Sequence, residues 1–269
     1  MRTPRLAGLG LGMMATVALG VAGCNAQGDA TPSASAPVTD SPSTPASSSA
    51  ADPAAAAALA SATAALGTQS FKLTMTAGPG VKLTALIDAP NSKGTGTLNI
   101  TGSNTDIQVK TLLVAQDLYV QVPGVTKANT WTHVDVSRLP EGANVGLRPG
   151  QIDPINTQQV LTSTTDVHQV DSRSYAGTLD LTKVAGITGV DKSTVTTWGA
   201  AAKNVPFTVG LDDQGRLSAL TIQLPAATGQ QAYPLDVLYT DYGTPVTADR
   251  PAAAEIVEAP SDLYSALGG

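Results

Sequence analysis

The chain has 269 residues, of which 42% are hydrophobic, 4% aromatic and 13% charged, and its formal net charge is −6. This acidic balance argues against a nucleic-acid surface, which needs clustered lysine and arginine. The single cysteine excludes an intrachain disulfide and a cysteine-based zinc site.

Residues 1–23 have the pattern of a secretory signal peptide. Two arginines precede an uncharged apolar run from 6 to 22, as in the charged and hydrophobic regions of such a peptide. The run borders on the length of a membrane span, so a retained anchor helix is the alternative. Its glycines weaken it as a permanent helix.

The run ends in Val-Ala-Gly-Cys at 21–24, which resembles the lipobox of bacterial lipoproteins. There the cysteine is acylated and becomes the first residue after cleavage; the alternative is an ordinary cleavage site with an incidental cysteine. Because Cys24 is the only cysteine and closes the apolar run, we expect lipid attachment at this residue. Two or more acyl chains hold a protein firmly on a membrane, which places the chain on the outer, extracytoplasmic face of the cell membrane.

Residues 24–52 are rich in serine, threonine, alanine and proline. Such a composition offers almost nothing to bury, so we expect a disordered tether after the lipidated cysteine. The folded domain is expected over 53–258, followed by a C-terminal tail over 259–269.

Helix-start signals and period-two alternation define the elements of this domain. Asp52-Pro53 opens an alanine-rich helix that Gly67 is expected to end. We expect further helices over 154–164, from Asp191 or Ser193 to 203, and over 261–267. Alternation predicts strands within 70–77, 81–88, 94–101, 106–115, 118–122, 131–140, 167–181, 205–211, 216–224 and 233–242.

The predicted fold class is α+β, with about ten strands in a curved antiparallel sheet, a half-barrel, and helices packed on its concave face. The consecutive apolar residues 112–114 predict a strand covered on both faces. Gly94 and Gly96 lie on one face of their strand and are expected to leave room there, or simply to mark a bend.

No catalytic pattern is present in the sequence. His133 and His168 lie on separate expected strands, and no H-E-x-x-H or G-x-S-x-G motif accompanies them. We interpret His133 as part of an exposed strand face, and the acidic run 212–215 as a hairpin turn rather than a calcium loop. The prediction is therefore a protein without catalytic residues, cofactor or metal site, and a hydrolase or metal enzyme using either histidine is the least favoured alternative.

Several short phrases resemble the LppX/LprAFG family of actinobacterial lipoproteins. They are SFKLTMTA, THVDVSRLP, SYAGTLDL, VPFTVGLDDQGRLSALTIQL and LYTDYGTPV, together with the lipobox, the tether and the helix containing Trp198. The resemblance implies a LolA/LolB-like half-barrel that binds triacylated glycolipids or other lipids between sheet and helices and helps carry them across the envelope.

The leading hypothesis is thus a membrane-anchored carrier of lipid or acylated glycolipid, with no protein partner identified. Acyl chains would contact inward strand and helix positions, although an error of one residue in register would exchange the two faces. The expected cavity residues are Phe71, Leu73, Met75, Leu83, Ala85, Ile100, Val109, Leu113, Val120, Leu161, Val195 and Trp198. The alternative is a non-catalytic envelope scaffold or partner-binding lipoprotein whose sheet encloses no ligand cavity.

Overall fold

The computed structural model describes residues 51–102, 105–124, 126–139, 153–185, 192–226, 231–261 and 264. The chain divides into two compact units, 1–48 and 49–269, and every described residue belongs to the second. The predicted signal peptide, Cys24 and nearly all of the tether lie outside the described residues. Within the described ranges, no helix is long and apolar enough to cross a membrane.

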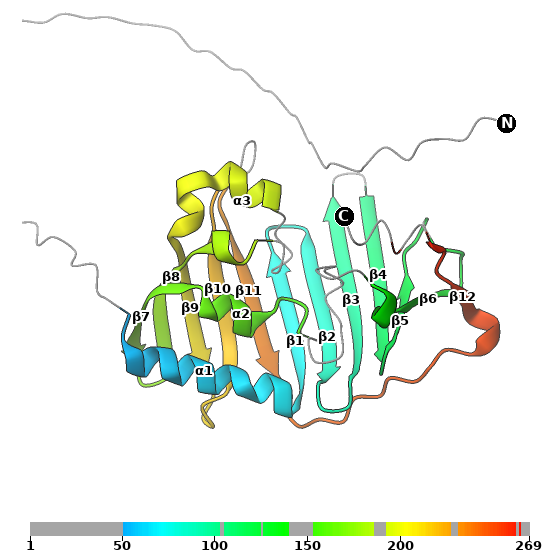
Figure 1. Ribbon diagram of the computed structural model, residues 1–269, viewed down its shortest axis with the longest axis horizontal. Helices are drawn as coiled ribbons and strands as arrows, with labels where there is room; N and C mark the ends of the chain where they lie inside the picture. The colour runs from blue at the N-terminus through cyan, green and yellow to red at the C-terminus, as the bar shows by residue number, and fades with distance from the viewer. Residues whose placement is uncertain are drawn as a thin grey trace, which may run out of the picture. The chain divides into compact units, whose positions relative to one another are not determined.

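Twelve strands of the described part form one open sheet in the order β12-β6-β5-β4-β3-β2-β1-β11-β10-β9-β8-β7 (Figure 1). All neighbours are antiparallel except β12 and β6, which are parallel. An antiparallel-dominated sheet with a few helices confirms the predicted α+β class. The strands are β1 Ser70–Ala77, β2 Val81–Asp88, β3 Lys93–Gly102, β4 Thr105–Val114, β5 Asp117–Gln121, β6 Trp131–Asp135, β7 Thr164–Asp171, β8 Ser174–Leu179, β9 Val205–Leu211, β10 Leu217–Leu224, β11 Tyr233–Thr240 and β12 Ile256–Glu258.

Two sets of antiparallel strands build this sheet. Strands β1 to β6 form a meander, and β7 to β11 form a second one that joins the first through β11 and β1. The β9–β10 connection is a tight turn at Asp212–Gly215, where Gly215 has a φ of +74°. Glycine adopts this left-handed conformation without a steric cost. The turn joins two paired antiparallel strands, which confirms the predicted hairpin.

The first helix, α1 Pro53–Thr68, begins as predicted. The Asp52 carboxylate accepts a hydrogen bond from the Ala54 amide, and proline follows the cap directly. The expected stop at Gly67 is wrong, because the helix continues to Thr68 and Gln69 caps it.

The other helices are shorter than predicted. Helix α2 spans Thr157–Thr162, and α3 spans Lys192–Trp198 and continues as the 3-10 turn η3 Gly199–Lys203. Further 3-10 turns are η1 Val136–Arg138, η2 Leu181–Lys183 and η4 Ala253–Glu255. The expected helix over 261–267 falls largely outside the described residues.

The three α-helices lie in front of one face of the sheet, over the half that runs from β7 to β1 (Figure 1). Helix α1 contacts α2, β7 and β10. We call this face, which carries Phe71, Leu73 and Met75, the inner face, and the opposite one the outer face. Most of the core lies on the inner face, where helical and strand side chains form one cluster.

A smaller core lies on the outer face of β4 and β5. Leu112 and Tyr119 are buried there together with Ala248, which belongs to the segment that follows β11. Since Leu113 is buried on the inner face, the prediction that this strand is covered on both faces is confirmed.

Candidate functional site

All nine strand residues of the predicted cavity share the inner face. The registers place Met75 opposite Leu83, Leu83 opposite Leu98, and Leu98 opposite Val109. Side chains that are directly opposite in an antiparallel pair point to the same face. The same registers bring the rest of the predicted strand set onto this face: Phe71, Leu73, Ala85, Ile100, Leu113 and Val120.

Burial divides this inner face into two zones. Phe71, Leu73, Ala85 and Leu113 are each at most 2% exposed, so they belong to the closed core. The second set lies toward the other end of β1 to β5, where side chains are half-buried and Ile100 is 37% exposed. We call this set the open apolar zone, and its members are Met75, Leu83, Leu98, Ile100, Val109 and Val120.

The predicted set omits Leu98, although it alternates with Ile100 along β3. Strict alternation of inner and outer residues could have found it.

The predicted helical residues belong to the closed core. Leu161, Val195 and Trp198 are all buried in the same cluster as the inner-face strand residues. Trp198 is 7% exposed, and its indole Nε1 finds no hydrogen-bond acceptor among the described residues.

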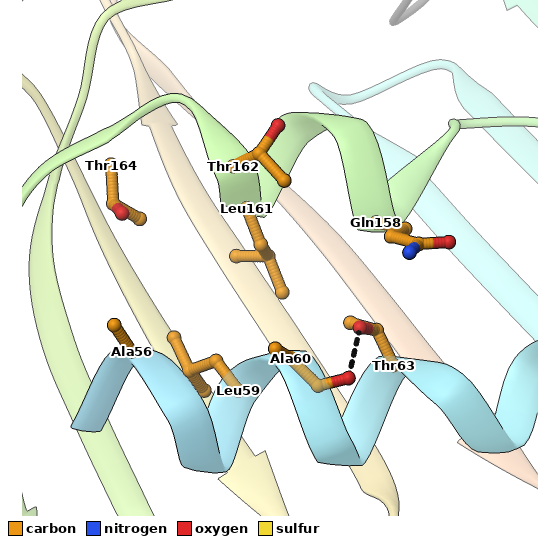
Figure 2. Close-up of a pocket in the computed structure, with 8 residues that line it drawn as sticks. All are labelled: Ala56, Leu59, Ala60, Thr63, Gln158, Leu161, Thr162 and Thr164. Carbon is orange, nitrogen blue, oxygen red and sulfur yellow. Dashed lines mark hydrogen bonds between the residues drawn. The ribbon is translucent and has the colours of Figure 1, made fainter. Parts of the chain in front are cut away.

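A groove of about 300 Å³ lies between α1 and α2. Figure 2 shows Leu161 extending from α2 toward α1, above Leu59 and Ala60. The volume of the groove is at the lower end of the range of small-molecule sites and corresponds to about ten water molecules. The groove is lined by Ala56, Leu59, Ala60, Thr63, Gln158, Leu161, Thr162 and Thr164.

The glycines of β3 do not leave the room that was expected. A side chain at Gly96 would meet the Thr111 hydroxyl at 2.5 Å, and one at Gly94 would approach the Leu86 carbonyl at 3.3 Å. The neighbouring strands therefore fill this space, and glycine permits their close approach.

A polar group lies at the start of α2. The Asp153 carboxylate accepts hydrogen bonds from the amides of Ile155 and Thr157, and the Thr157 hydroxyl lies 2.5 Å from that of Tyr239. Burial raises the pKa of Asp153, although these amides oppose the rise. Burial also raises the pKa of Tyr239 well above its usual value, and the nearby Asp153 charge adds to this.

The outer face holds a charged cluster around His133, which is not the exposed residue that we expected. Its side chain is only 12% exposed, with Nδ1 2.7 Å from Glu258 and Nε2 2.8 Å from Asp117. The ring also stacks on Tyr119, with the centroids 5.1 Å apart. The reason is that β12 pairs with β6 and brings Glu258 beside the histidine.

His168 and the acidic turn at 212–215 make fewer side-chain contacts with distant parts of the chain than His133 does. The His168 side chain on β7 is half-exposed, 3.8 Å from Asp166. In the turn, the Asp212 carboxylate accepts hydrogen bonds from the Gln214 and Arg216 amides and from the Arg216 guanidinium. These contacts hold the β9–β10 hairpin.

Neither a scan against protein-family models nor a search of curated proteins finds a match for this chain. The inner face offers a partly open apolar surface and an adjoining half covered by helices, with a groove between two of them. This arrangement is suited to binding apolar groups by removing them from water.

Proposed function

We propose that this protein is an extracytoplasmic lipoprotein, anchored through Cys24, that binds lipid or acylated glycolipid by its acyl chains. In this proposal the sheet is a LolA/LolB-like half-barrel with the helices on its concave face, and the ligand lies along the inner face. The resemblance of the sequence to the LppX/LprAFG family supports the same function.

The open apolar zone is the observation that carries the proposal. Six apolar side chains on the five neighbouring strands β1 to β5 remain partly accessible on the inner face. Three of them, Met75, Leu83 and Val120, also pack against the closed core, and an apolar face that stays partly uncovered beside a core is suited to binding apolar groups. The zone continues into the closed core through Leu83 and Ala85 on β2, so a chain that covers it adds to an existing apolar layer.

Acyl chains consist of methylene groups, which an apolar surface binds by removing them from water. Each buried methylene contributes about 0.8 kcal/mol, which corresponds to about a fourfold change in affinity. We therefore expect affinity to rise steeply with chain length until the chain outgrows the apolar surface. The polar residues that line the α1–α2 groove, Gln158 and Thr162 among them, are suited to an ester or headgroup rather than to a methylene chain.

Leu83 and Thr84 provide a matched pair of positions for a test. They are consecutive on β2 and point to opposite faces of the sheet. We expect Leu83→Glu to weaken binding of a fluorescent sixteen-carbon fatty acid by more than about tenfold, because a charge is costly on a surface covered by hydrocarbon. Thr84→Glu should leave binding unchanged.

Equal affinity of both variants for the probe would contradict the proposed binding surface. If the unchanged protein took up no acyl probe at all, the scaffold alternative would be favoured. The tightly packed closed core is the observation that speaks for that alternative, since residues such as Leu73 and Ile87 have no exposed surface.

A further inference from the structure

The segment that follows β11 passes from one face of the sheet to the other. Val246 and Ala248 pack on the outer-face cluster, and β12 then pairs with β6 and forms the edge of the sheet. Beyond this strand, Ala259 and Tyr264 are buried in the inner-face core. The C-terminal segment therefore closes one edge of the sheet and reaches the inner face around it.

Within the described part of this segment, few backbone contacts hold it at the edge. Strand β12 has only three residues, and the Ala259 amide adds a hydrogen bond of 2.9 Å to the His133 carbonyl. Further along, the Tyr264 hydroxyl accepts a hydrogen bond from the Asp135 amide, and the Arg138 guanidinium lies 4.2 Å from the Tyr264 ring centre. A short parallel pairing of this kind contributes little by itself.

The His133 side chain joins this segment to the sheet. Its two ring nitrogens lie within hydrogen-bond distance of carboxylates from two different strands, Asp117 on β5 and Glu258 on β12. An ionised carboxylate only accepts hydrogen bonds, and a neutral imidazole has a single N–H to donate. Both contacts can thus be hydrogen bonds only when the ring is a protonated imidazolium.

We propose that His133 is a protonation-dependent latch, which holds β12 and Tyr264 on the sheet edge while it is charged and releases them when it loses its proton. Loss of the proton leaves a lone pair facing one of the two carboxylates, which replaces an attraction with a repulsion. The release would free the edge of β6 and withdraw Tyr264 from the inner face. This inference holds whether or not the inner face binds lipid.

The charged groups around the ring favour the imidazolium. Besides Asp117 and Glu258, Asp135 carries a carboxylate two residues along β6, while Arg250 lies near the hydroxyl of Tyr119, the residue whose ring stacks on His133. Burial by itself lowers the pKa of His133, but the hydrogen bonds and charges of Glu258 and Asp117 exceed this effect and raise the pKa.

The raised pKa of His133 sets the sign of the pH dependence of the latch. A folded-state pKa above the ordinary histidine value means that the latch contributes fully below about pH 6.5. Its contribution is then lost as the pH rises through the higher, folded-state pKa.

The full chain contains only two histidines, so nitrogen-15 spectra of the imidazoles can follow each one from about pH 5 to 9. We expect His133 to keep its proton at a pH above the ordinary histidine value of about 6.5, because its two carboxylate partners stabilise the imidazolium. Hydrogen-exchange protection of the amides of 256–259 should fall over the same pH range, by about tenfold for each unit by which the pKa of His133 is raised.

Two glutamates of the same segment provide the variant and its control. Glu258→Gln removes one carboxylate and should abolish the pH dependence of protection in 256–259. Glu255→Gln, on the exposed turn η4 three residues earlier, should leave it intact. Amides of the β9–β10 hairpin should not respond in either variant. Loss of the His133 proton at or below about pH 6.5, or protection of 256–259 that stays constant while His133 titrates, would overturn the latch.

Discussion

Single residues on β1 show how strongly the two faces of the sheet differ. Leu73 has no exposed surface and lies between Ala85 and Tyr239, whereas Thr76, three residues later, is exposed on the outer face. The energetic role of a side chain in this domain is therefore set by which face of the strand it occupies.

We expect Leu73→Ala to lower the free energy of unfolding by about 3 kcal/mol, because it removes buried methylenes and leaves a cavity that the sheet cannot close. Denaturant-induced unfolding of the full chain measures this change. The control is Thr76→Ala, for which the expected change lies within about 0.5 kcal/mol. A loss below about 1 kcal/mol for Leu73→Ala would show that the inner-face core is loosely packed.

Individual residues also show where prediction from sequence fails. Alternation along β1 to β5 assigned nine residues to one face of the sheet, and the strand registers place them on one face, because side chains along a strand point alternately to the two faces; their contact with a ligand stays a prediction. His133 was misjudged for the opposite reason. Its carboxylate partners lie 16 and 125 residues away in the chain, and no local sequence pattern indicates a contact between residues so far apart.

Among the elements, α1 is the one whose start was read most directly from sequence. The Asp52 side chain caps the first turn, and its amide also donates a hydrogen bond of 2.8 Å to the Val167 carbonyl on β7. The cap therefore both begins the helix and fixes it at the edge of the sheet.

Replacement of Asp52 separates these two contributions. We expect Asp52→Ala to cost about 1 kcal/mol of unfolding free energy, because the Ala54 amide loses its acceptor. Asp52→Asn keeps an acceptor and should cost much less, and neither variant removes the backbone bond to Val167. Thermal unfolding of the two variants side by side provides the comparison. Equal losses for both would show that the charge of Asp52, not the cap, is what matters.

The elements that were predicted poorly are those set by distant contacts. Helix α2 was expected to open at Pro154, but it begins at Thr157 because Asn156 has a left-handed backbone, with a φ of +49°. Strand β12 was not predicted, since three residues carry almost no alternation and its pairing with β6 depends on the path of the whole C-terminal segment.

At the scale of the whole molecule, we propose that lipid attached at Cys24 keeps the domain at the membrane. If two or more acyl chains are attached there, the protein remains on the membrane. We expect Cys24→Ala to move the protein from the membrane fraction to the soluble fraction of cells that express it, without changing its affinity for the acyl probe. A variant that stays membrane-bound would indicate a retained helical anchor instead.

The proposed function requires that the inner face carries an acyl-bearing ligand. Native mass spectrometry of the protein purified from the organism that produces it tests this claim most directly, when each native mass is compared with the mass after denaturation. The comparison separates lipid that is attached covalently at Cys24 from lipid that is bound without a covalent bond. We predict a native mass that exceeds the denatured mass by one lipid or acylated glycolipid, and loss of this excess in Leu83→Glu but not in Thr84→Glu. Identical native and denatured masses, together with no uptake of added acyl ligands, would contradict the proposed function.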